Sequence, residues 1–270
     1  MIKDAICDYF RDKTGQRPSI NIQNPDVQLN LFVQKGQATL YYDTSCAPLH
    51  KRGWRRENTE ATLHESLAAA LLIGSGYKKG ITFCDPFCGS GTFLIEAAMI
   101  ATNTPPGFFR KAWGFTHFPL YREEEWQAYK ASIDRQIIPL EKGMICGCDK
   151  DLETFKTCYR HIKDTGFRGL IDLENQDIAI YHPPCKPQLV LCNPPYGKRL
   201  ELTKAVSQGL RSFIERECTD KTHIFLLTSE PQMVSTLGRR AKEEIAFKNG
   251  GIAVALYHLE RPFDAETSPN

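Results

Sequence analysis

The amino-acid sequence predicts an α/β fold in which an antiparallel hairpin closes a mostly parallel sheet. From residue 81 onward, short apolar runs alternate with segments of helical periodicity, which is typical of strand–helix–strand units. A glycine turn joins the first run to a helix, and two strand-like runs within residues 244–260 meet at a Gly-Gly turn. Residues 1–47 have a helix and hairpin pattern of their own, so a small α+β segment is expected before the main domain.

Composition limits the function classes. With 270 residues, of which 41% are hydrophobic, the chain is long enough for one full α/β domain with an appendage. Its 34 Lys and Arg residues nearly balance 32 Asp and Glu residues, so any nucleic-acid surface must be local. No apolar run has the length of a membrane span, and residues 1–13 lack the layout of a signal peptide. We therefore expect a cytoplasmic location and no membrane partner.

The ten cysteines do not indicate a metal centre. Their spacings, such as Cys84-x3-Cys88 and Cys146-x-Cys148, form no paired CxxC units, and several lie inside apolar runs. Reduced thiols packed in the core, with no metal, are expected.

The N-terminal segment has the pattern of a helix and a hairpin. Residues 2–13 put their apolar side chains on one helical stripe, and residues 27–33 and 38–42 alternate with a period of two. A helix and a single hairpin cannot bury their own apolar face. We expect this segment to pack on the following domain or to be the end of something larger.

A basic segment follows at residues 48–56, PLHKRGWRR. Charge runs are usually solvated linkers, and this interpretation stays open. A tryptophan between cations also suits nucleic-acid phosphates and a stacked base. The residues assigned to such contacts are His50, Lys51, Arg52, Trp54, Arg55 and Arg56, with Lys198 and Arg199 from a later basic pair.

Helices are predicted around the strands. The TLHE sequence from Thr62 is a capping box that opens a helix ending near Gly74. A long Pro- and aromatic-rich insertion at residues 103–122 precedes another helix, which carries Trp126 and Tyr129 on one stripe. Loops of this length are usually functional, so residues 108–111 are candidates for a lid or a substrate contact.

The strongest local motif is DPFCGSGT at residues 85–92. It follows the apolar run 81–84 and precedes a helix, so two glycines spaced G-x-G bring the backbone close to a ligand at the helix N-terminus. The turn is not a P-loop, and it lacks the third glycine of a dinucleotide fingerprint. The ligand-binding candidates are Asp85, Pro86, Phe87, Cys88, Gly89, Ser90, Gly91 and Thr92.

A second motif, NPPY at residues 193–196, follows the apolar run PQLVLC. Two prolines cannot supply ladder donors, so the chain must leave the sheet at the carboxyl end of this strand. Ligands of open α/β sheets collect at those ends, and both motifs face one crevice if their strands are parallel neighbours.

Together, DPFCGSGT and NPPY resemble class I S-adenosylmethionine methyltransferases that modify exocyclic amines. With LHKRGWRR upstream, the chain resembles THUMP-associated RNA guanine-N2 methyltransferases, especially bacterial 23S ribosomal RNA enzymes, from about Gln28 onward. The resemblance implies a Rossmann-like methyltransferase fold, S-adenosylmethionine as cofactor and RNA as partner. It also implies that the chain begins partway through a THUMP domain, whose N-terminal portion is then missing.

Two further acids are cofactor candidates. Asp149 ends the run MICGC, where an acid accepts ribose hydroxyls in related sites, and the resemblance assigns it and Lys150 to the ribose. The alternative is that Asp149 caps the helix that follows. The resemblance also implies that Asp177 accepts from the adenine amine, with Ile178 against the ring.

The resemblance also suggests the chemistry. An exocyclic amine is a poor nucleophile, so Asn193 and the Pro194 carbonyl are expected to accept its two hydrogens and aim the nitrogen lone pair. Pro195 completes the turn, and Tyr196 can stack on the unstacked base.

Domain boundaries and alternatives complete the expectation. We expect a THUMP-like segment at 1–47, a basic linker at 48–58 and a methyltransferase domain at 59–270. Methylation of tRNA, of DNA adenine-N6 or of protein glutamine and a non-catalytic RNA-binding module stay open as other functions.

Overall fold

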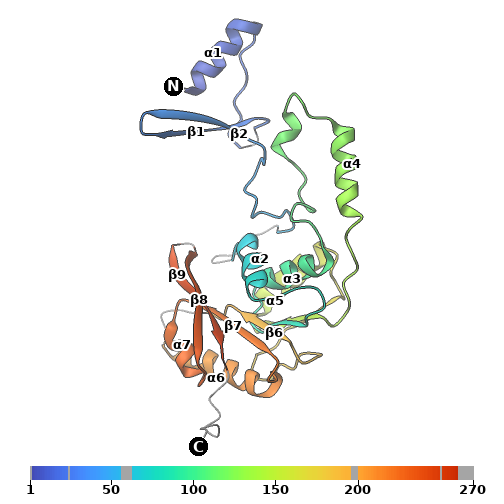
Figure 1. Cartoon of the computed structure of the whole chain (residues 1–270), viewed down its shortest axis with the longest axis vertical. Coiled ribbons are helices and arrows are strands. Elements are labelled where there is room, and N and C mark those ends of the chain that lie inside the picture. Colours follow the sequence, from blue (N-terminus) through green and yellow to red (C-terminus); the bar gives the residue numbers. More distant parts are fainter. Residues whose placement is uncertain (1, 24, 56–62, 196–199, 250, 261–270) are drawn as a thin grey trace, which may run out of the picture. The chain divides into compact units, whose positions relative to one another are not determined.

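The computed structural model describes residues 2–23, 25–55, 63–195, 200–249 and 251–260. It divides into two compact units (Figure 1). One comprises Met1–Pro48 with Ala112–Gln127, and the other comprises Leu49–Lys111 with Ala128–Asn270. The second unit contains the predicted sheet and the glycine turn.

A seven-stranded sheet organises this second unit, in the order β5-β4-β3-β6-β7-β9-β8. Strands β3 to β7 pair with one another in parallel, while β9 is antiparallel to both β7 and β8. The predicted fold class is therefore confirmed. The strands are β3 (Phe83–Asp85), β4 (Ile145–Cys148), β5 (Ile171–Glu174), β6 (Leu189–Cys192), β7 (His223–Thr228), β8 (Ala241–Asn249) and β9 (Ile252–Leu259).

Helices cover both faces of the sheet: α2, α3 and α5 lie on one face, and α6 and α7 on the other (Figure 1). Because strand side chains alternate, Phe83 joins the core cluster of the first face and its neighbour Cys84 joins that of the second. The helices are α2 (Glu65–Gly74), α3 (Thr92–Thr102), α4 (Glu123–Asp134), α5 (Leu152–Asp164), α6 (Leu200–Glu217) and α7 (Pro231–Thr236). All ten cysteines are free thiols, and most are buried.

The predicted start of α2 was wrong. The expected capping box would put Glu65 three residues inside the helix, but α2 begins at Glu65 with His64 as its N-cap, and the Glu65 carboxylate pairs with Arg55. Helix α7 ends at Thr236, and Ala241 pairs with Leu259 in the sheet. On α4, Tyr129 of the aromatic stripe is 61% exposed.

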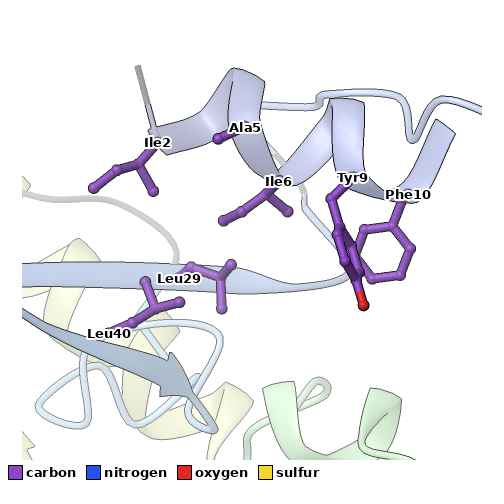
Figure 2. A pocket seen from close by; sticks show the side chains of 7 residues that line it. All are labelled: Ile2, Ala5, Ile6, Tyr9, Phe10, Leu29 and Leu40. Carbon is purple, nitrogen blue, oxygen red and sulfur yellow. The ribbon is translucent and has the colours of Figure 1, made fainter. Parts of the chain in front are cut away.

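The first unit holds α1 (Ile2–Thr14) and a hairpin of β1 (Gln28–Gln34) and β2 (Gln37–Asp43). Its turn residues Lys35 and Gly36 both have positive φ, as a two-residue hairpin turn of the I′ type requires. Figure 2 shows α1 side chains above the hairpin, around an apolar groove of about 440 Å³. The groove residues Leu29 and Leu40 are 40% and 51% exposed, so, as expected, the segment does not bury its own apolar face.

Part of the long insertion belongs to this first unit. The Tyr42 hydroxyl donates to the Gly114 carbonyl at 2.9 Å, and the Phe115 amide donates to Thr44 O at 3.0 Å. A Cβ at Gly114 would lie 2.4 Å from Asp43 O, so only glycine fits this approach. A 3-10 turn, η1 (Gly114–His117), follows. In the described residues, no helix is long and apolar enough to cross a bilayer.

Candidate functional site

The two predicted motifs lie at the same edge of the sheet. Strands β3 and β6 pair in parallel, with Phe83 opposite Leu189 and Cys84 opposite Val190, so the glycine turn and Asn193 follow adjacent strand ends. Strand β3 also pairs with β4, and the chain crosses from one side of β3 to the other. This is the topological switch point at which open α/β sheets bind ligands.

The two glycines of the turn have different roles. Gly89 has φ +54, and a Cβ there would meet nothing nearer than Phe87 O at 4.0 Å, which leaves its surface open to a ligand. Gly91 has φ +86 and caps α3, and a Cβ there would lie 2.6 Å from Cys158 Sγ. The first glycine therefore suits a ligand, whereas the second is required by packing against α5.

Asp149 holds the turn to the neighbouring strand. Its Oδ2 accepts from the Gly89 amide at 3.0 Å, and its Oδ1 accepts from the Asp151 amide at 2.9 Å. The residue that caps α5 is Asp151, which accepts from Thr154 N at 2.8 Å, so the interpretation of Asp149 as this cap is wrong. Burial raises the pKa of Asp149, while these amides oppose the shift.

Asp85 is buried at the end of β3. Its Oδ1 accepts from the Phe87 amide at 3.1 Å, and 1% of the residue is exposed. Burial raises its pKa to about 8, and the nearby Asp149 carboxylate adds to the increase. Without a cation nearby, Asp85 is therefore mostly a neutral acid at pH 7.

Asp177 follows β5 and lies near the Asp149 loop. Its Oδ2 is 3.7 Å from Lys150 Nζ, and both side chains are well exposed, so this pair contributes little to stability. Ile178, by contrast, is 6% exposed and packs in the core beneath α6, where a Cβ at Gly209 would be 2.9 Å from its Cγ2. This burial leaves Ile178 little surface for the expected contact with a ring.

Asn193 directly follows β6, and its side-chain oxygen differs from most buried acceptors. Its side-chain Oδ1 is buried and has no hydrogen-bond partner within the part of the chain that the structure describes. An acceptor left without a partner is costly in a folded protein and needs an explanation, such as an ordered water, an ion or a catalytic role. Pro194 is buried and Pro195 exposed, while Tyr196, Lys198 and Arg199 lie outside the described residues.

Part of the basic segment is buried, which bears on its expected role. Arg52 and Trp54 are 8% and 3% exposed, and the Arg52 guanidinium binds both carboxylate oxygens of Glu96 at 3.3 Å. Arg55 pairs with Glu65 at 2.9 Å. Buried carboxylates and the core already occupy the side chains of Arg52, Trp54 and Arg55, which leaves these three residues little surface for a contact with RNA.

The remaining members of the segment differ. Lys51 is exposed and His50 half-buried, while Arg56 lies outside the described residues. Burial, followed by the stacked His64 ring at 4.2 Å, lowers the pKa of His50. Lys51 is the described cation of this segment that is most accessible to a polyanion.

Two residues of the insertion, Phe109 and Arg110, contact the basic segment. The Arg110 guanidinium donates to Lys51 O at 3.0 Å, and a Cβ at Gly53 would lie 2.5 Å from Phe109 O. Phe109 also packs against the core. The described contacts of Phe109 and Arg110 therefore hold the basic segment and the core together, and they do not support the hypothesis that residues 108–111 form a lid.

Several supporting residues were missed by the sequence analysis. Of these residues, Glu96 has the clearest sequence signal, because an acid inside the apolar helix FLIEAAMIA needs a buried partner. His161 Nδ1 lies 3.1 Å from Ser90 O, and Asn175 Nδ2 donates to Asp149 O at 2.8 Å. Neither contact has a sequence signal, because each joins residues that are distant in the chain.

These residues fit a donor with a nucleoside part and a cationic centre. Gly89 offers an open backbone, Asp149 retains acceptor capacity beyond its two amide bonds, and Asp85 can ionise beside a positive charge. The orphaned Asn193 oxygen lies at the adjacent strand end. No cluster of metal-ligating side chains occurs among the described residues.

Comparison with known proteins gives the family. A family model described as "RMKL-like, methyltransferase domain" matches residues 52–258, and a THUMP domain model matches residues 1–43. The chain is 36% identical over 277 residues to the ribosomal RNA large subunit methyltransferase K/L of Pseudomonas paraeruginosa. That match covers 96% of this chain and 37% of the relative, so the chain spans little more than a third of the relative's length.

Solved structures agree with the family. A methyltransferase designated SMU.472, complexed with SAH, has a TM-score of 0.80 and 27% identity, covering 95% of this chain and 68% of that one. A protein from Listeria monocytogenes, named as an N6-adenine-specific DNA methylase, has a TM-score of 0.78 and 28% identity, covering 97% and 68%. Because the first family model spans most of the sequence, this chain belongs to the RMKL-like methyltransferase domain family.

Proposed function

We propose that this chain transfers a methyl group from S-adenosylmethionine to the exocyclic N2 amine of a guanine in RNA, most readily 23S ribosomal RNA. The observation that carries the proposal is the buried Asn193 oxygen at the strand end next to the glycine turn, which has no hydrogen-bond partner among the described residues. The THUMP match and the name of the Pseudomonas relative support RNA as the substrate.

The glycine turn and its acids would hold the donor. Asp149 accepts from ribose hydroxyls with its remaining acceptor capacity, and Asp177 accepts from the adenine amine. Asp85 ionises to balance positive charge, which its raised pKa makes responsive to a bound cation. When bound, the donor supplies an electrophilic methyl group on a sulfonium.

Asn193 and Pro194 would hold the acceptor amine. The Asn193 side-chain oxygen and the Pro194 carbonyl each accept one amine hydrogen, which directs the nitrogen lone pair. This acts by positioning and by electrostatic stabilisation of charge that develops on the nitrogen, so no strong base is needed. Tyr196 would stack on the unstacked base, while His50, Lys51, Arg56, Lys198 and Arg199 stay candidates for contacts with RNA.

A second candidate is methylation of adenine-N6 in DNA. The Listeria relative, which carries that name, has a TM-score of 0.78 to this chain. Adenine N6 is also an exocyclic amine, so the same Asn193 and Pro194 acceptors would serve it. RNA is favoured because the THUMP model matches the N-terminal unit.

One experiment separates these functions. The chain is incubated with radiolabelled donor and either undermodified total RNA or unmethylated DNA, and the nucleosides are then analysed. We expect N2-methylguanosine, in ribosomal RNA more than in tRNA, and a rate lowered about a hundredfold in Asn193→Ala. A methyl group on a ring nitrogen, a carbon or a ribose hydroxyl would contradict the role of Asn193, while N6-methyladenine in DNA would select the second candidate.

A further inference from the structure

Arg55 joins the basic segment to the glycine turn through two hydrogen bonds, and a third joins it to helix α2. Its Nη1 donates to Ser90 Oγ at 3.0 Å, and its Nη2 donates to Thr92 Oγ1 at 2.7 Å. Its Nε donates to Glu65 Oε1 at 2.9 Å, and the Arg55 and Glu65 side chains are 8% and 5% exposed. One buried guanidinium thus holds the side chains on both sides of Gly91.

The position of these contacts matters because Gly91 is the point at which the turn passes into helix α3. Gly91 caps α3 at φ 86, and a glycine has no side chain with which to accept from the first amides of the helix. Without a local cap, the orientation of the turn depends on contacts from outside it. Arg55 supplies two of them, and the planar fork of a guanidinium fixes their direction as well as their distance.

Other contacts hold the same turn from the opposite side. His161 on α5 donates through Nδ1 to Ser90 O at 3.1 Å, and burial lowers the pKa of His161, which favours this neutral ring. Trp54 connects the two sides, with Arg55 Cζ 4.8 Å above its ring and the His161 ring edge-on at 5.3 Å. Ser90 is therefore held by its side chain from one segment and by its backbone from another.

We propose that Arg55 is a positioning residue of the donor site: it sets the conformation of residues 88–92 without touching the donor. The inference rests on the proposed function, since it assumes that this turn binds S-adenosylmethionine. It gives Arg55 a task in donor binding, where the sequence had indicated a contact with RNA.

A purely structural role for Arg55 needs a matched control, and Arg52 provides one. Both arginines lie in the same segment, and both pair with a buried glutamate on a helix. Arg52 binds Glu96 and the Leu49 carbonyl, and within the described residues it makes no hydrogen bond to the glycine turn. Weakening either ion pair should cost stability, but only Arg55 should affect the donor.

The test compares Arg55→Lys with Arg52→Lys in this chain. Lysine keeps the charge but cannot reach three partners in a fork. Calorimetry with S-adenosylhomocysteine is done at a temperature where circular dichroism shows both variants fully folded. Arg55→Lys should raise the Kd on the order of tenfold, the effect of losing one or two charge-assisted hydrogen bonds, while Arg52→Lys should change it less than about twofold.

A double-mutant cycle gives the second readout. If Arg55 acts through the turn, the losses in affinity from Arg55→Lys and from Ser90→Ala with Thr92→Ala should be strongly non-additive. An unchanged Kd in Arg55→Lys, equal losses in both lysine variants, or additive losses in the cycle would each overturn the inference. Failure of the unsubstituted chain to bind S-adenosylhomocysteine would overturn the proposed function itself, and the inference with it.

Discussion

Asp149 accepts a hydrogen bond from the Gly89 amide, with 3.0 Å between Gly89 N and Asp149 Oδ2, and so ties the end of β4 to the glycine turn. Its other oxygen accepts from the Asp151 amide at 2.9 Å. An ionised carboxylate has about four acceptor positions, so capacity remains for ribose hydroxyls. One side chain therefore both shapes the turn and can bind the donor.

Replacing this carboxylate should weaken donor binding. Asp149→Ala is expected to cost about 1–3 kcal/mol of S-adenosylmethionine binding, the scale of lost charge-assisted hydrogen bonds. The control is Asp151→Ala, which removes the α5 cap and should lower stability but leave donor affinity unchanged. Calorimetry and denaturant unfolding on each variant measure the two effects, and equal donor affinity in Asp149→Ala and wild type would remove Asp149 from the site.

A side chain at position 91 should lower stability, because it would meet Cys158. Gly91→Ala places a Cβ 2.6 Å from Cys158 Sγ at φ 86, and strain with overpacking should lower the free energy of unfolding by about 1–3 kcal/mol. Adding Cys158→Ala removes the sulfur and should recover part of that loss, measured by urea unfolding. No recovery would show that the backbone conformation alone sets the cost.

The sheet could be predicted because its signals are local. Apolar runs such as residues 189–192 and the double proline after Asn193 show where strands lie and where they end. The pairing of β3 with β6 was a conditional expectation from that pattern, and the structure confirms it. The position of Asn193 could be predicted by the same local rule, because this residue directly follows the carboxyl end of β6.

The basic segment could not be predicted because its partners are distant in sequence. Arg52 meets Glu96 and Arg55 meets Glu65, and these buried pairs depend on tertiary packing that charge patterning does not encode. The sequence resembled an exposed platform because Trp54 has cations on both sides. The same residues instead form buried ion pairs, and only the positions of Glu96 and Glu65 distinguish this arrangement from an exposed platform.

The two kinds of cation in this segment should respond differently to substitution. Arg52→Ala leaves Glu96 buried without its partner, which should lower the unfolding free energy by about 3–5 kcal/mol. Burial already raises the pKa of Glu96 despite Arg52, so adding Glu96→Gln should recover part of the stability. Thermal and denaturant unfolding measure both variants, and a loss in Arg52→Ala below about 1 kcal/mol would contradict the burial argument.

Lys51→Ala is the complementary test on the exposed side. Lys51 is exposed, so its replacement should leave stability nearly unchanged. If it meets a phosphate, the slope of log K for RNA binding against log salt should become shallower by about one unit. An unaltered slope would leave this residue as part of a solvated surface.

Asp85 should make the stability of the chain depend on pH. Its pKa is raised from 3.8 to about 8 by burial, so the folded chain holds the proton more tightly than the unfolded chain does. The resulting contribution to stability is complete below about 3.8 and is lost as pH rises toward about 8. The free energy of unfolding, measured across this range, should decline more in wild type than in Asp85→Asn. This variant keeps the acceptor for the Phe87 amide but does not titrate.

The same group predicts proton release on donor binding. A cationic donor favours the ionised form of Asp85, so near pH 7 binding should expel a proton and should tighten as pH rises. Calorimetry in two buffers with different ionisation enthalpies detects this release. Asp85→Asn should abolish it, and identical heats in both buffers for the wild type would show that Asp85 does not sense the donor.

The sharpest prediction concerns Asn193→Asp. The orphaned Oδ1 is an acceptor, and a carboxylate keeps an acceptor oxygen at the same place, so part of the methyl-transfer activity should survive where Asn193→Ala loses about a hundredfold. That residual activity should fall at low pH, because protonation turns the acceptor into a donor. Wild type should show no pH step of this kind, since an amide does not titrate. The measurement is single-turnover methyl transfer across pH at saturating donor. If Asn193→Asp were as inactive as Asn193→Ala at every pH, the charge or the lost amide hydrogens would matter more than the acceptor oxygen, and the positioning mechanism would be wrong.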